Sequence, residues 1–212
     1  MYKKDIPDFI NKLKKAYPDA TCSLDFDTPF QLLTAVALSA QCTDERVNKV
    51  TPALFKRCPT IQDFIDIDIH ELENLIHSCG FYKNKAKNIK LSAEQTIKNF
   101  NGVVPVEMEN LTTLAGIGRK SANVIRLEVF GIATGIAVDT HAKRVSNLLG
   151  LSKNTNPLKI EQDLIKFFPQ KYLKDINHLF VWHGRKTCVA RNPKCENCPV
   201  NMYCNYFKNL KK

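Results

Sequence analysis

The sequence predicts an all-α protein. Apolar residues recur at intervals of three and four along most of the 212-residue chain, which is the period of one face of an α-helix. A strand-like alternation of apolar and polar residues occurs at Ile65–Ile69, but it has no evident partner segment, so we interpret it as a helix end or turn. Hydrophobic residues make up 44% of the chain, which is ample for a packed core.

The expected helices follow one another along the chain. The first carries an apolar stripe from Ile6 to Tyr17 and ends before Pro18. The segment 30–40 is almost wholly apolar, which predicts a buried helix, and it is shorter than the roughly 20 residues needed to span a bilayer. Further helices are predicted around Val47–Leu54, up to Gly80, up to the turn Asn101-Gly102, and over 120–130, 140–149, 158–168 and 171–185.

Four cysteines near the C-terminus have the spacing C-x6-C-x2-C-x5-C, at Cys188, Cys195, Cys198 and Cys204. Zinc and an iron–sulfur cluster both take four thiolates, and the unequal gaps favour a cluster because only Cys195 and Cys198 form a close pair. Disulfides are disfavoured because the first residues lack the apolar segment of a secretory signal. The other four cysteines are expected to be small buried hydrophobes: Cys22, Cys42, Cys58 and Cys79.

The charge balance favours a polyanionic partner. The chain has a formal net charge of +10, and residues 173–212 contain eight Lys or Arg against Asp175 and Glu196. Many basic proteins are merely soluble, so charge alone favours nucleic acid only weakly.

An apolar-Gly-apolar-Gly turn joins two short helical patterns in the segment 111–125. Gly116 and Gly118 are expected to adopt backbone conformations closed to other residues and to let a DNA backbone approach, while the next helix start receives a phosphate. The plain alternative is an ordinary helical hairpin. A nucleotide-binding P-loop is disfavoured because Arg119 precedes Lys120 and Leu114 occupies the site of the first glycine.

Two residues near this turn are candidates for covalent chemistry. Lys120 opens the second helix of the hairpin and is either a nucleophile or a phosphate-binding lysine. Asp139, nineteen residues later, stands where the helix 140–149 should have its N-cap, and a carboxylate fixed there could activate an amine or stabilise a cation.

Together these motifs resemble endonuclease III, a family of DNA glycosylases and AP lyases in the helix–hairpin–helix superfamily. The resemblance covers nearly the whole chain. It rests on LSAQCTD at 38–44, GFYKNKAKNI at 80–89, LAGIGRKSANV at 114–124, VDTH at 138–141, HGRKTC at 183–188 and the cysteine spacing.

The resemblance implies a fold, a cofactor and a set of functional residues. A six-helix domain would span about 22–134, and a second domain would join residues 1–21 to 135–212. Lys120 would be the Schiff-base nucleophile, Asp139 the catalytic carboxylate, and the four C-terminal cysteines the ligands of a [4Fe–4S] cluster. Residues expected to contact DNA are Gln41, Phe81, Gly116, Gly118, Arg119 and His141, with His141 a hydrogen-bonding residue at a helix start and not a base.

The implied activity is base-excision repair of oxidised pyrimidines in double-stranded DNA, by a monomer in a bacterial-type cytoplasm, associated with the nucleoid. Within the superfamily the alternative is a mismatch-specific or dimer-specific glycosylase. From another class, a non-catalytic DNA-binding module with structural zinc remains open. Phe81, Ala142 and Lys143 depart from the usual family pattern, which leaves the range of lesions open.

Overall fold

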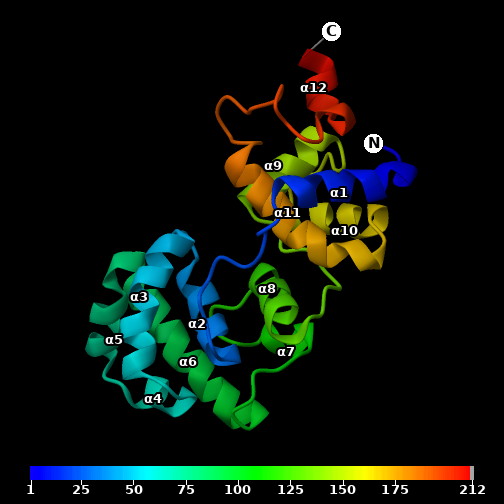
Figure 1. The fold of residues 1–212 in the computed structure, drawn as a ribbon. Coiled ribbons are helices and arrows are strands. Elements are labelled where there is room, and N and C mark those ends of the chain that lie inside the picture. Colours follow the sequence, from blue (N-terminus) through cyan, green and yellow to red (C-terminus); the bar gives the residue numbers. More distant parts are fainter. Residues whose placement is uncertain (211–212) are drawn as a thin grey trace. The chain divides into compact units, whose positions relative to one another are not determined.

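The computed structural model describes residues 1–210 and contains no strand in that range. The all-α prediction is confirmed. The described chain divides into two compact units, one formed by residues 1–22 and 132–212 and the other by residues 23–131 (Figure 1). No helix in the described range is both long enough and apolar enough to cross a membrane.

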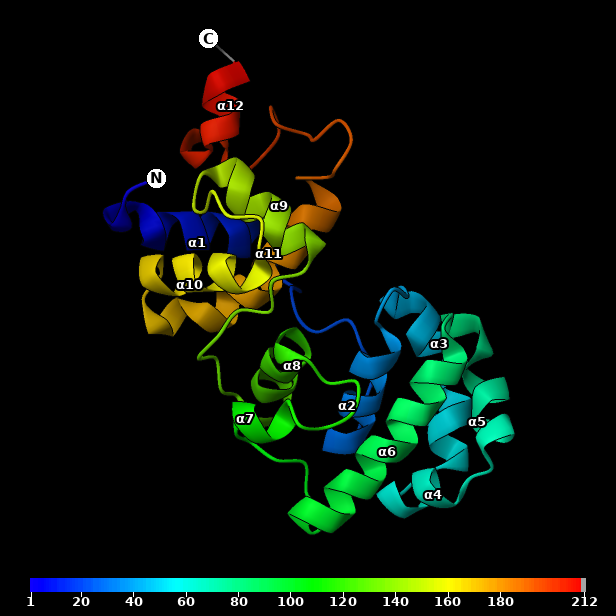
Figure 2. The same ribbon diagram turned by 180° about the vertical axis from the view of Figure 1, so that it is seen from behind.

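The unit of residues 23–131 is built around one buried helix, α2. Its bounds are Pro29–Leu38, and all nine residues after Pro29 are buried, as the apolar segment 30–40 predicted. Helix α2 packs against α3, α6 and α8, and Figure 2 shows the same helices from behind. The remaining elements of this unit are α3 (Asp44–Arg57), α4 (Ile61–Asp66), α5 (Ile69–Ile76), the 3-10 turn η2 (His77–Cys79), α6 (Tyr82–Phe100), α7 (Met108–Leu111) and α8 (Arg119–Phe130).

The alternating segment Ile65–Ile69 is a helix end followed by a helix start, as predicted. Helix α4 ends at Asp66, and the carboxylate of Asp68 accepts the backbone N–H groups of His70 and Glu71 as the N-cap of α5. This cap satisfies donors that an isolated helix start would leave unpaired, so the alternation forms a corner and not a strand.

The second unit joins the two ends of the chain. Phe9 of the N-terminal helix α1 (Ile6–Ala16) lies with its ring 6.2 Å from that of Phe168 and 6.3 Å from that of Phe180. These rings form the centre of an apolar core that residues far apart in sequence share. The other elements are η1 (Lys3–Asp5), α9 (Thr140–Leu149), α10 (Pro157–Phe167), η3 (Gln170–Tyr172), α11 (Leu173–Lys186), η4 (Asn201–Tyr203) and α12 (Asn205–Leu210).

Candidate active site and cysteine cluster

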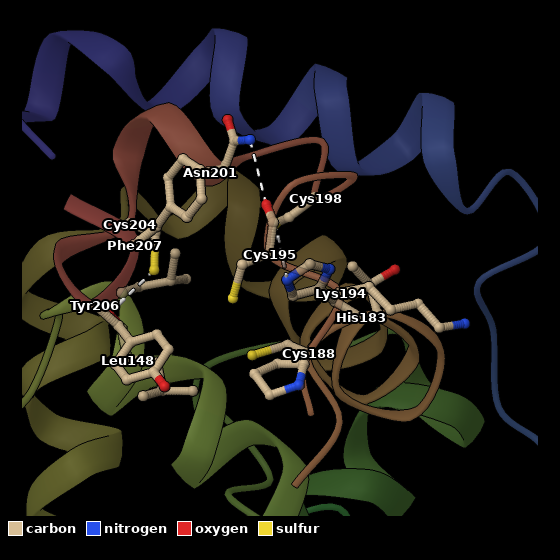
Figure 3. A pocket seen from close by; sticks show the side chains of 13 residues that line it. Leu148, His183, Cys188, Lys194, Cys195, Cys198, Asn201, Cys204, Tyr206 and Phe207 are labelled. Atoms are coloured by element: carbon tan, nitrogen blue, oxygen red, sulfur yellow. Dashed lines mark hydrogen bonds between the residues drawn. The ribbon is translucent and has the colours of Figure 1, made fainter. Parts of the chain in front are cut away.

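The four C-terminal cysteines line one pocket beyond the end of α11. Figure 3 shows the sulfur atoms of Cys188, Cys195 and Cys204 around a common space, and Cys198 lines the same pocket. Leu148, Leu149 and Phe207 supply apolar walls. The loop therefore brings together the four residues that the spacing singled out.

The thiols of this pocket are poorly suited to exist as free thiolates. Burial, together with repulsion from the neighbouring cysteines, raises the pKa of Cys188 and of Cys198 to about 11. A cationic centre would reverse this balance, because metal binding holds cysteine in its thiolate form. No carboxylate from the described residues lines the pocket, so its donors are the soft sulfur ligands that iron–sulfur clusters take. Among residues 1–210, no three His, Cys, Asp or Glu side chains form a ready site for a single metal ion.

A buried histidine supports the pocket from α11. His183 is 1% exposed, and burial lowers its pKa to about 4, so the ring is neutral near pH 7. Its Nδ1 lies 2.8 Å from the hydroxyl of Tyr17, and its Nε2 lies 3.7 Å from the sulfur of Cys198. The Tyr17 hydroxyl also lies 2.7 Å from the hydroxyl of Thr187. The ring thus connects the N-terminal segment with a cysteine of the pocket.

Arg144 of α9 holds the start of the cysteine loop. Its guanidinium donates to the carbonyl of Cys188 at 2.8 Å and to the carbonyl of Gly184 at 2.7 Å. A side chain at Gly184 would place its Cβ 2.7 Å from the Cβ of His141, so α9 and α11 approach too closely for any larger residue there. His141 itself is half-buried, with Nδ1 3.2 Å from Arg144.

The glycine turn lies between α7 and α8 and is held by α6. Gln95 accepts the N–H of Ala115 at 2.8 Å and donates to the carbonyl of Thr113 at 3.2 Å. Gly116 has φ +79°, and a Cβ there would lie 3.2 Å from the Cβ of Asn88. Both the left-handed backbone and the close packing therefore favour glycine at Gly116.

Gly118 differs from the expectation for it. Its φ of −93° and ψ of 176° describe extended backbone, which any residue can adopt. A Cβ at Gly118 would meet no atom within 4 Å. The expectation of a glycine-only conformation is therefore wrong for this residue, because it is the N-cap of α8 and N-caps are extended.

The two candidate catalytic residues occur in different units. Lys120 is exposed, in the first turn of α8 and next to the exposed Arg119. Asp139 is the N-cap of α9, and its Oδ1 accepts the N–H of Ala142 at 2.7 Å. The cap predicted at Asp139 is present.

Gln41 and Phe81 share an unusual backbone conformation within the unit of residues 23–131. Their φ values are +54° and +48°, and both side chains are exposed, Phe81 by 64%. A large side chain seldom adopts this left-handed conformation, and where it does the surroundings hold it there.

Several supporting residues carried no sequence signal of their own. Tyr17, Gln95 and Arg144 act through partners between 3 and 170 positions away, so no local pattern marks them. His183 lies in the motif HGRKTC, but the sequence assigned it no role. Two of the scattered cysteines also differ from expectation, because Cys22 and Cys42 are half-exposed, whereas Cys58 and Cys79 are buried as predicted.

Comparison with known proteins agrees with this arrangement. Residues 34–170 match the HhH-GPD superfamily of base excision DNA repair proteins, and residues 188–204 match the iron–sulfur binding domain of endonuclease III. The chain is 53% identical over 192 residues to endonuclease III of Synechocystis sp., covering 91% of this chain and 88% of that protein. Endonuclease III of Escherichia coli K12 is 37% identical over 199 residues, covering 94% of each chain.

A solved structure shares the fold over the full length. It is a trapped covalent intermediate of endonuclease III with DNA, which matches with a TM-score of 0.92, 40% identity and full coverage of both chains. The chain therefore belongs to the endonuclease III family of the HhH-GPD superfamily: it is a DNA glycosylase and AP lyase with a [4Fe–4S] cluster as its cofactor.

Proposed function

We propose that this enzyme removes oxidised pyrimidines from duplex DNA and then cleaves the strand 3′ to the abasic site, through a Schiff base on Lys120. The observation that carries the proposal is the position of Lys120, exposed in the first turn of α8 and two residues after the glycine turn. A nucleophile in that position is presented at the point where the hairpin would bind the DNA backbone.

The DNA backbone is expected to bind at the start of α8. Its N-cap is Gly118, which offers no side chain to the first N–H groups of the helix. Such groups, together with the helix dipole, bind phosphate well. Contacts of this kind position DNA without reading its sequence, as an enzyme that must search all sequences for damage requires.

The lysine amine would carry both steps of the reaction. A damaged base first leaves the stack, because its glycosidic bond cannot be reached inside a duplex. The Nζ of Lys120 then attacks C1′, the base departs with the electron pair of the glycosidic bond and takes up a proton, and the sugar ring opens to a Schiff base. Loss of a proton from C2′ expels the 3′ phosphate by β-elimination, and water releases the lysine. The covalent intermediate trapped in the related endonuclease III supports an attack of this type.

Asp139 would stabilise positive charge as the base leaves and assist deprotonation of the amine. Its Oδ1 is engaged in the cap of α9, which fixes the carboxylate, and Oδ2 accepts no hydrogen bond from the described residues. A fixed carboxylate with one oxygen available is suited to this role.

Gln41 would fill the space left by the extruded nucleotide, and Phe81 would insert near the opposite strand. Arg119 and His141 would contact the backbone. Cys188, Cys195, Cys198 and Cys204 would be the ligands of the [4Fe–4S] cluster. When bound, the cluster cross-links the four cysteines of a short basic loop and so stabilises the fold of that loop. We further propose that the enzyme acts as a monomer.

A panel of defined duplexes tests the proposal. We expect purified enzyme to excise thymine glycol and to nick an abasic site, while leaving undamaged thymine and thymine opposite guanine intact. Release of the mismatched thymine without release of thymine glycol would assign the chain to a mismatch-specific activity instead. Failure to nick the abasic site would contradict the lyase step on Lys120.

A further inference from the structure

Lys85 is a buried lysine with no acidic partner. It is 6% exposed, and no carboxylate among residues 1–210 forms an ion pair with it. Burial lowers its pKa. Removing an ammonium group from water is costly unless its donors are satisfied, so a residue such as methionine would fill this position more cheaply if only packing mattered.

The ammonium of Lys85 connects the C-terminal ends of two helical segments. Its Nζ donates to the carbonyl of Leu38 at 2.8 Å and to the carbonyl of Cys79 at 2.8 Å. Leu38 is the last residue of α2, and Cys79 is the last residue of the 3-10 turn η2. Carbonyls at helix ends lack intrahelical partners and carry partial negative charge, so one cation satisfies both.

Gln41 and Phe81 closely follow the two helix ends that Lys85 binds. Gln41 follows Leu38 by three residues and Phe81 follows Cys79 by two, and these are the two exposed residues with left-handed backbone described above. Burial and the neighbouring thiol of Cys42 raise the pKa of Cys79 to about 11, so the two turns also approach each other at these cysteines. Lys85 therefore lies behind both turns and holds them to one helix, α6.

We propose that Lys85 is a positioning residue that fixes these two turns in one arrangement before DNA binds, so that Gln41 and Phe81 enter the duplex together. The inference rests on the proposed function, in which those residues occupy the extrusion site. Ordering the two turns in advance removes a conformational cost from the step in which the nucleotide leaves the stack. In this proposal Lys85 contacts neither the sugar nor the base. Its substitution should therefore slow the reaction only on substrates whose nucleotide must be extruded.

Helix α6 supplies a matched control. The Nζ of Lys90 donates to the carbonyls of Ile65 and Ile67. This half-buried lysine therefore also caps a helix end, but one that does not precede Gln41 or Phe81. The variants Lys85→Met and Lys90→Met each remove two hydrogen bonds from an ammonium while keeping an unbranched apolar side chain. Lys85→Arg keeps the charge and the donors.

The test compares lyase activity on an abasic site in a duplex and in a single strand, where no extrusion is needed. We expect Lys85→Met to lower kcat/KM on the duplex by roughly ten- to a hundred-fold, which is the loss of rate that a small displacement of an active-site group causes. Cleavage of the single strand should stay near the wild-type value. Lys90→Met should change both substrates equally, and Lys85→Arg should restore part of the duplex activity. A 2-aminopurine placed opposite the site should show a smaller fluorescence increase on binding to Lys85→Met than to wild type.

Equal losses on the two substrates would overturn the inference and leave Lys85 a purely structural residue, as would an unchanged duplex rate. Single-strand cleavage by Lys85→Met also shows that the variant is folded. Absence of lyase activity in the wild-type enzyme would instead refute the proposed function, so the two failures are distinguishable.

Discussion

The hydroxyl of Tyr17 lies 2.8 Å from Nδ1 of His183. Because the Tyr17 hydroxyl donates its single proton to the hydroxyl of Thr187 at 2.7 Å, it accepts from Nδ1–H of His183, so the neutral ring presents its unprotonated Nε2 to the sulfur of Cys198 at 3.7 Å. The N-terminal segment can thus set the tautomer of a ring that contacts the cysteine pocket, just as outer groups orient the ligands of other metal sites.

Tyr17→Phe should therefore weaken the cysteine loop. The change leaves the buried Nδ1 without its partner, which costs about 1–3 kcal/mol. We expect thermal unfolding, followed by the visible absorbance of the cluster, to occur at a lower temperature. Tyr2→Phe is the control, because Tyr2 is 75% exposed. Equal stability of the two variants would show that the Tyr17 hydroxyl does not support the pocket.

The hairpin glycines should respond differently to alanine. Gly116→Ala forces a left-handed alanine and a 3.2 Å contact with Asn88, so it should lower the free energy of unfolding by about 1–2 kcal/mol. Gly118→Ala meets neither obstacle and should cost less stability, but its new methyl group would lie on the surface proposed to approach DNA. Urea unfolding and DNA-binding titrations separate these effects. Larger destabilisation by Gly118→Ala would contradict this description of the turn.

The capping role and the catalytic role of Asp139 can be tested separately. Asparagine caps helices about as well as aspartate, whereas alanine at an N-cap costs about 1 kcal/mol. We expect Asp139→Asn to keep wild-type stability yet slow base release by roughly 10²- to 10⁴-fold, the range of a positioned acid or base. Single-turnover base release from thymine glycol DNA measures this. A wild-type rate in Asp139→Asn would reduce Asp139 to a cap.

The sequence predicted the helices well where burial and local signals coincide. Residues 30–38 of the predicted segment 30–40 are buried in α2, and the cap at Asp139 begins α9 where expected. The short α12 was not predicted, because six residues are too few to show a periodic pattern.

The candidate site was predictable only in part. The spacing of Cys188, Cys195, Cys198 and Cys204 is local, and these residues do line one pocket. By contrast, Tyr17 meets His183 across 166 positions and Lys85 meets Leu38 across 47, and such contacts depend on packing that no short motif encodes. The extended conformation of Gly118 was missed because composition alone does not distinguish an N-cap glycine from a left-handed one.

Covalent trapping tests the central claim, that Lys120 is the nucleophile. Enzyme incubated with lesion DNA in borohydride should form a stable protein–DNA adduct, because reduction converts the Schiff base to an amine. Peptide mapping should place the adduct on Lys120. Lys120→Gln should yield no adduct while binding the DNA nearly as well, and the exposed Lys98→Gln should trap like wild type. An adduct that persists in Lys120→Gln, or that maps to another residue of the wild-type enzyme, would contradict the account.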